Sequence, residues 1–87
     1  MNITRSATAG TMQSSDLLVQ VDPADRLEVV IDSTVKKQFE HLIRACIDNV
    51  LARHHVTKAR VTVTDRGALD YAIEARLETA LRRAAEV

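Results

Sequence analysis

The sequence has very few aromatic residues and no excess of charge of either sign. Phe39 and Tyr71 are its only aromatic side chains apart from histidines, and its 12 lysines and arginines balance 12 aspartates and glutamates. Proteins that bind single-stranded nucleic acids stack the bases on aromatic rings. A balanced charge also provides no long-range field to attract nucleic acid or an acidic membrane surface. The composition therefore argues against a nucleic-acid or membrane partner.

The sequence is equally poor in cysteine and in long apolar runs. Cys46 is the only cysteine, so no internal disulfide can form, and no Cys/His cluster has the spacing of a zinc site. The first residues contain no apolar run of signal-peptide length, and no window approaches the roughly 20 apolar residues of a membrane span. We therefore expect a soluble, cytoplasmic protein without a metal site.

The pattern of apolar residues predicts a small α+β domain. A chain of 87 residues forms one domain with a thin core. Alternation and turn residues predict strands at 17–21, 27–31 and 60–64, the first two joined as an antiparallel hairpin. Helical spacing predicts one helix from about 33 to 54 and a second after residue 67. The order β-β-α-β-α predicts two layers, with the helices on one face of a three-stranded or slightly larger sheet.

The first predicted helix has the strongest periodicity. Its apolar face should contain Val35, Phe39, Leu42, Ile43, Cys46, Ile47, Val50 and Leu51. Asp32 or Ser33 can cap the first turn through a side-chain oxygen. Phe39 is the only large aromatic residue on this face and thus the best candidate for a core anchor. Cys46 should behave as a small buried hydrophobe with a raised thiol pKa.

The N-terminal part of the chain has a different composition. Residues 1–14 are rich in threonine, serine, alanine and glycine and show little periodicity, which predicts a flexible arm followed by a single α+β domain over residues 15–87. The arm contains Ser14 and most of the run Ala9-Gly10-Thr11-Met12-Gln13-Ser14-Ser15-Asp16. Small residues and two adjacent hydroxyls on an accessible segment are suited to the covalent modification of a serine.

This run resembles the modification site of the citrate lyase acyl carrier protein (gamma subunit) family, which usually reads Ala-Gly-Thr-Leu-Glu-Ser-Ser-Asp. In that family the first of the paired serines carries the prosthetic group, and this serine corresponds to Ser14. Gln13 and Tyr71 depart from the residues that are common in the family. The resemblance covers nearly the whole chain, because further segments recur in the same order: Ile31-Asp32-Ser33, Val35-Lys36-Lys37-Gln38-Phe39, Asp65-Arg66-Gly67-Ala68-Leu69-Asp70 and Ala75-Arg76-Leu77.

The resemblance implies a carrier subunit with no active site of its own. The Ser14 hydroxyl would be joined through a phosphodiester to 2'-(5''-triphosphoribosyl)-3'-dephospho-CoA, whose thiol bears acetyl and citryl thioesters while citrate is cleaved to acetate and oxaloacetate. The implied partners are the alpha subunit (an acyl transferase), the beta subunit (a citryl lyase) and the transferase that attaches the group. Two alternatives stay open: the similar carrier of citramalate lyase, and a non-enzymatic α+β interaction module without a cofactor.

No set of histidines and carboxylates in the sequence has the form of a catalytic site. His41 falls off the apolar face, and His54 and His55 lie at the end of the first predicted helix, where such groups suit the helix dipole. Asp16 has two interpretations, since it can turn the chain into the first strand or mark a docking site for the modifying enzyme. Gly10 is either flexible filler or a point of close approach for that enzyme.

Overall fold

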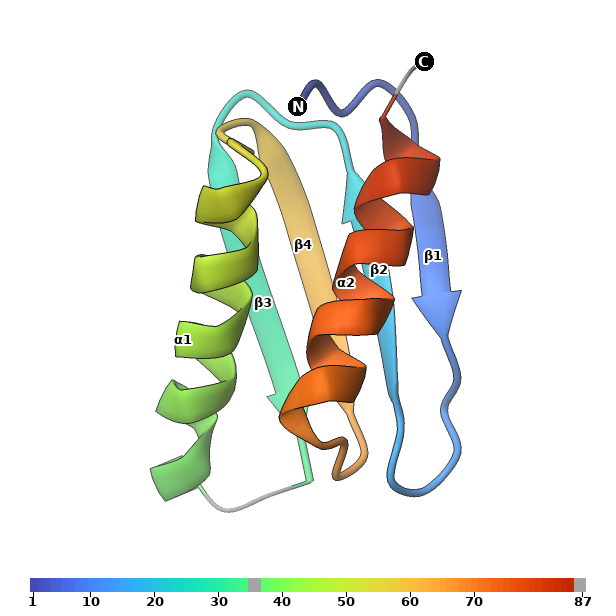
Figure 1. Ribbon diagram of the computed structural model, residues 1–87, viewed down its shortest axis with the longest axis vertical. Helices are drawn as coiled ribbons and strands as arrows, with labels where there is room; N and C mark the ends of the chain where they lie inside the picture. Colours follow the sequence, from blue (N-terminus) through green and yellow to red (C-terminus); the bar gives the residue numbers. More distant parts are fainter. Residues whose placement is uncertain (35–36, 86–87) are drawn as a thin grey trace.

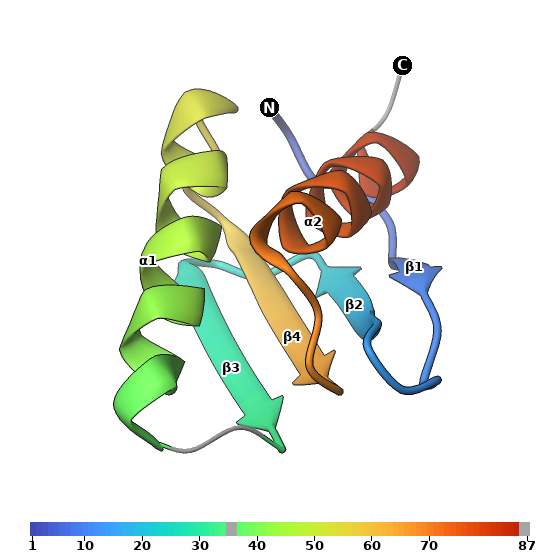
Figure 2. The same cartoon turned by 60° about the horizontal axis from the view of Figure 1, so that its bottom comes forward.

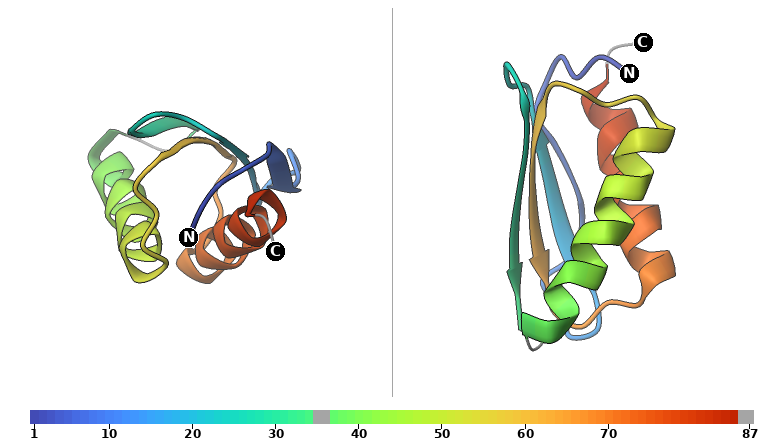
Figure 3. Two further views of the ribbon diagram at one scale, coloured as in Figure 1. Left: turned by 90° about the horizontal axis from the view of Figure 1, so that it is seen from above. Right: turned by 90° about the vertical axis from the view of Figure 1, so that its left-hand side faces the viewer.

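The computed structural model describes residues 1–34 and 37–85. Its elements are β1 (Ala7–Gly10), β2 (Leu17–Asp22), β3 (Leu27–Ser33), α1 (Lys37–Arg53), β4 (Ala59–Asp65) and α2 (Asp70–Ala84). The strands form one four-stranded sheet, and both helices lie on the same face of it (Figures 1 and 3). The predicted two-layer α+β class is therefore confirmed, with β1 as a strand that the sequence did not predict.

The order of strands across the sheet is β1-β2-β4-β3 (Figure 2). β2 pairs antiparallel with β1 and with β4, whereas β3 and β4 are parallel and are connected through α1. The predicted hairpin of β2 with β3 was wrong, because β4 lies between them. β2 and β4 are the strands whose alternate residues are fully buried, and β3 is only partly buried. At the edge of the sheet, β3 leaves Leu27 and Val30 exposed, although its sequence is as apolar as that of β4.

The core fills the space between the sheet and the two helices. Its members alternate along the central strands and recur every three or four residues along the helices, as the periodicity predicted. Leu69, which directly precedes α2, lies outside the core and is 64% exposed. The most deeply buried apolar side chains are Leu17, Val19, Val21, Ile47, Val50, Leu51, Ala59, Val61, Val63, Ile73, Leu77, Ala80, Leu81 and Ala84.

The N-terminal segment is part of the folded body. β1 extends the sheet beside β2, with Ala9 opposite Val19 and buried. Ile3 is buried as well and bridges to Ala85 after the end of α2. The prediction of a flexible arm over residues 1–14 was therefore wrong for this stretch. The small residues of β1 give little apolar periodicity, so the pattern did not reveal the strand. A strand at this position needs only backbone hydrogen bonds to the edge of β2, and small side chains fit under α2.

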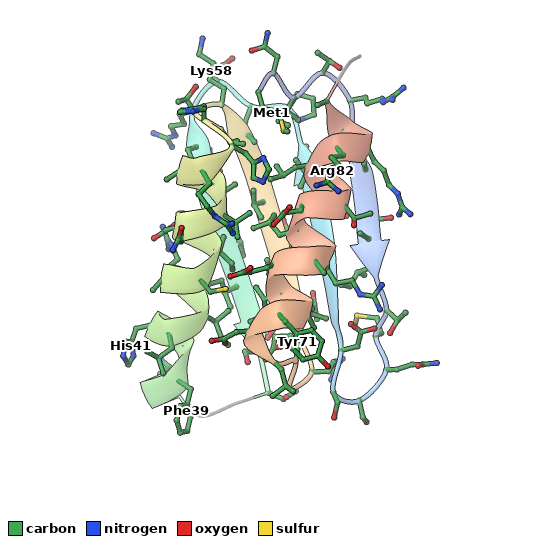
Figure 4. The ribbon with its side chains drawn as sticks, in the orientation of Figure 1. Met1, Phe39, His41, Lys58, Tyr71 and Arg82 are labelled. Carbon is green, nitrogen blue, oxygen red and sulfur yellow. The ribbon has the colours of Figure 1, made fainter. Side chains whose placement is uncertain are left out.

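The first turns of α1 are more exposed than their periodicity predicted. Phe39 is 46% exposed and Leu42 is 55% exposed, while Ile43 and Ile47 further along the same face are buried. Figure 4 shows Phe39 at the start of α1, pointing away from α2. The prediction of Phe39 as a core anchor was wrong, because periodicity identifies an apolar face but does not show how far the opposing layer extends.

The described part of α1 ends at Arg53, one residue from the predicted end, and begins at Lys37. Val35 lies outside the described residues. Asp32 and Ser33 were expected to cap the first turn of this helix, but both belong to β3. The first turn itself includes residues outside the described ranges. The Ser33 hydroxyl donates a hydrogen bond to Asp65 Oδ2 at 2.9 Å.

Candidate modification site

The paired serines lie in a tight turn between β1 and β2. The Asp16 amide donates to the Gln13 carbonyl oxygen at 3.2 Å, so Ser14 and Ser15 occupy the two central positions of the turn. Both serines are exposed, and Ser15 has a φ of 63°, in the left-handed region. The turn lies at the end of the sheet opposite the two chain termini (Figure 1). An enzyme can therefore approach the Ser14 hydroxyl from solvent.

The backbone conformation at the start of this turn requires a glycine at position 10. Its φ is 98°, and a Cβ atom there would collide with the Leu17 carbonyl oxygen. The same carbonyl oxygen accepts a hydrogen bond from the Thr11 amide at 3.0 Å. The close approach of two backbone segments thus explains the glycine without reference to a modifying enzyme. This backbone requirement is a third explanation beside the two interpretations drawn from the sequence, and it contradicts flexible filler.

Asp16 is the centre of a hydrogen-bond network that closes the turn. Its Oδ2 accepts from the Thr11 hydroxyl at 2.6 Å and from Arg76 Nη2 at 2.9 Å. Its Oδ1 accepts from the Leu17 amide at 2.8 Å and from Arg76 Nε at 3.2 Å. The Thr11 hydrogen bond, the Arg76 guanidinium and the Leu17 amide lower the pKa of Asp16 from 3.8 to about 2. Asp16 is therefore ionised at neutral pH, and the hydrogen bonds of its carboxylate fix the backbone where the chain enters β2.

The other side of the turn is held by the loop that follows β4. The Ser15 amide donates to the Arg66 carbonyl oxygen and the Arg66 amide donates to the Asp16 carbonyl oxygen, each at 2.8 Å. The loop itself is fixed by the buried Asp65, whose Oδ1 accepts from the Ala68 amide at 2.9 Å. Residues 65–68, which the sequence pointed to only as part of a segment that recurs in the family, thus support the turn.

Sequence reasoning missed the role of Arg76. Its side chain reaches Asp16 across 60 positions of the chain, from the second turn of α2. A local pattern around the serines carries no information about such a partner. Only the packing of α2 beside β1 and β2 brings the two residues together.

The remaining reactive side chains do not gather at the turn. Cys46 is partly buried, and desolvation, together with the Asp70 and Glu74 carboxylates, raises the pKa of its thiol as expected. His54 Nε2 lies 3.6 Å from Glu78 Oε2 on the surface of the helix pair. Figure 4 shows His41 on the outer side of α1.

Within residues 1–34 and 37–85, no group of three or more His, Cys, Asp or Glu residues is arranged to hold a metal ion. None of the described helices is long and apolar enough to cross a membrane.

The sequence matches the acyl carrier protein family model described as malonate decarboxylase delta subunit, over residues 4–84. Three relatives carry the name citrate lyase acyl carrier protein. The one from Albidiferax ferrireducens is 54% identical, over 95% of this chain and 87% of its own. The one from Haemophilus influenzae strain PittEE is 48% identical, over 99% and 90%. The one from Treponema denticola is 44% identical, over 99% of both chains.

A solved structure supports the fold independently of the sequence. A crystal structure of a protein from Thermus thermophilus superposes with a TM-score of 0.63 over 95% of this chain and 16% of the other, at 12% sequence identity. At that identity the likeness concerns the fold alone.

The family model and the relatives together define the class as acyl carrier proteins. Within that class, this chain belongs to the citrate lyase acyl carrier protein family. The family predicted from the run around Ser14 is confirmed.

Proposed function

We propose that this chain is the acyl carrier subunit of citrate lyase and that Ser14 is the attachment point of its prosthetic group. The observation that carries the proposal is an exposed Ser14 in an anchored turn, in a chain 44–54% identical over nearly its full length to three citrate lyase acyl carrier proteins. The group is 2'-(5''-triphosphoribosyl)-3'-dephospho-CoA, joined through a phosphodiester. A dedicated transferase attaches it, and the carrier acts in the cytoplasm.

The architecture suits a carrier and not a catalyst. The Ser14 hydroxyl supplies one oxygen of the phosphodiester and needs no histidine beside it after attachment. When bound, the prosthetic group supplies the thiol that bears the acyl thioesters. The domain contributes a rigid support, because backbone hydrogen bonds tie the turn to β2 and to the loop after β4.

The physical advantage of such a carrier is a high effective concentration. A tethered thioester meets the active sites of the alpha and beta subunits within one assembly, so each acyl transfer becomes an intramolecular encounter. Cys46 has no part in this chemistry, since its thiol is partly buried and has a raised pKa.

The family model's description favours one second candidate, the carrier subunit of malonate decarboxylase. The relatives favour citrate lyase over it, because the three named above are all called citrate lyase acyl carrier protein. The citramalate lyase carrier remains a close variant of the first proposal, since it differs in the substrate of the partner subunits.

Reconstitution tests the proposal. The modified chain is mixed with the alpha and beta subunits of citrate lyase, and oxaloacetate release from citrate is measured. We expect full activity with the parent and with Ser15→Ala and Cys46→Ala, and none with Ser14→Ala. Activity with Ser14→Ala would contradict the assignment of Ser14. Activity on citramalate but not on citrate would contradict the assignment of citrate lyase. Activity with the subunits of malonate decarboxylase but not with those of citrate lyase would contradict it as well.

A further inference from the structure

Arg76 makes a two-pronged contact with the turn that carries the paired serines. Its Nε and Nη2 atoms lie 3.2 and 2.9 Å from the two carboxylate oxygens of Asp16. A guanidinium that meets a carboxylate through both nitrogens fixes orientation as well as distance. The other charged contacts described for α2, from Glu74 to Arg53 and from Glu78 to Arg53, His54 and Arg82, lie on the surface of the helix pair. Arg76 instead joins α2 to the turn.

The turn is therefore held from two sides. Arg76 holds Asp16 on the side of the helix layer, and the Arg66 backbone holds Ser15 and Asp16 on the side of β4. Asp16 follows directly on the two serines, so its position determines where they lie. Without Arg76, the Asp16 carboxylate would keep the Thr11 and Leu17 contacts but lose its tie to α2.

The conformation of Ser15 makes the turn sensitive to this loss. Its φ of 63° is unfavourable for a residue with a side chain and persists only where the surroundings impose it. Adjacent Cα atoms are about 3.8 Å apart, so a change in the turn can alter which of the two hydroxyls a modifying enzyme meets. A turn kept in one conformation presents the two hydroxyls at two fixed positions.

We infer that Arg76 is a positioning residue that, through Asp16, holds the turn so that the transferase modifies Ser14 and not Ser15. This inference rests on the proposed function. Among the described residues, Arg76 hydrogen-bonds to Asp16 and to neither Ser14 nor Ser15. It acts by fixing the geometry that the transferase meets.

The test is a kinetic and mapping experiment on the full-length unmodified chain. The parent, Arg76→Gln, Arg76→Lys and Arg82→Gln are incubated with the prosthetic-group transferase. The kcat and KM of attachment are measured, and peptide mapping gives the ratio of Ser14 to Ser15 adducts. Arg82→Gln is the matched control, because Arg82 lies on the same helix (Figure 4) but its guanidinium contacts Glu78. Unfolding curves establish that each variant is folded.

We expect Arg76→Gln to lower kcat/KM roughly 10- to 100-fold, as displacements of about 1 Å do in positioned reactions, and to yield a Ser15 adduct. Arg76→Lys keeps the charge but not the paired contact, so its result should be intermediate. Arg82→Gln should behave as the parent. A folded Arg76→Gln chain that is modified only on Ser14, at a rate within about twofold of the parent, overturns the inference.

Asp16→Asn provides a second route if Arg76→Gln does not fold, because it should by itself lower kcat/KM and yield a Ser15 adduct, and a folded Asp16→Asn chain modified only on Ser14 at the parent rate overturns the inference. Where both variants fold, the two substitutions should not add, since Arg76 acts through Asp16, and the double variant should be no slower than the slower single variant. Additive effects overturn the inference. Failure of the proposed function is distinguishable, because the parent chain itself would then acquire no adduct on Ser14.

Discussion

Substitution of Phe39 tests how the core is distributed between the two helices. Phe39 is 46% exposed, so its partial burial should contribute only about half of the ~1.5–3 kcal/mol expected for a fully buried phenylalanine. Phe39→Ala should therefore lower the free energy of unfolding by about 1 kcal/mol. The first turns of α1 are exposed to solvent, so the truncation leaves no closed cavity. Leu77 is fully buried, and Leu77→Ala should cost about 2–5 kcal/mol through lost transfer energy and a residual cavity.

The assay is urea unfolding of both variants and the parent, followed by far-ultraviolet circular dichroism. A similar denaturant slope in all three chains shows that the same surface unfolds, so the shifts in midpoint report stability. A Phe39→Ala variant as unstable as Leu77→Ala would refute the reasoning, since Phe39 would then have to be packed in the core.

Three further predictions follow from the turn and the N-terminal segment. Deletion of residues 2–10 should lower the unfolding midpoint strongly, because it removes a strand of the sheet and the buried Ile3 and Ala9; an unchanged midpoint would show that the segment contributes nothing. Gly10→Ala should destabilise the protein by more than about 1 kcal/mol in the same assay, since φ is 98° and the added Cβ meets the Leu17 carbonyl. The pKa of Asp16 is lowered to about 2, so its contribution to stability is fully present above the unfolded value and is lost as pH falls from about 4 through 2. Asp16→Asn should lose less stability than the parent across that range, and equal losses in acid titrations would argue against the network.

The sequence predicted the elements better than their arrangement. Alternation of buried residues located β2 and β4, and helical spacing located α1 and α2, because both patterns are local consequences of burial on one face. The pairing of β2 with β4 depends on contacts far apart in the sequence, so the local turn at residues 22–25 suggested a hairpin that does not exist. The sequence did not predict β1, because alanine, threonine and glycine give no strong periodic pattern of apolar residues.

The candidate site was predictable to the extent that it is local. Ser14 was located by its neighbours in the run from Ala9 to Asp16, and the turn explains why glycine is needed at position 10. Arg76 and the Arg66 backbone reach the turn from distant parts of the chain, so no inspection of the run could name them. The hydrogen-bonding partners of Asp16 had to come from the fold.

The most direct test of the carrier assignment is peptide mapping of the chain produced together with its prosthetic-group transferase. We expect one covalent adduct with the mass of the phosphodiester-linked group, located on the peptide that contains Ser14 and absent from Ser14→Ala. Ser15→Ala, the adjacent control, should carry the same adduct on Ser14. An unmodified parent chain, or an adduct that persists in Ser14→Ala, would contradict the account.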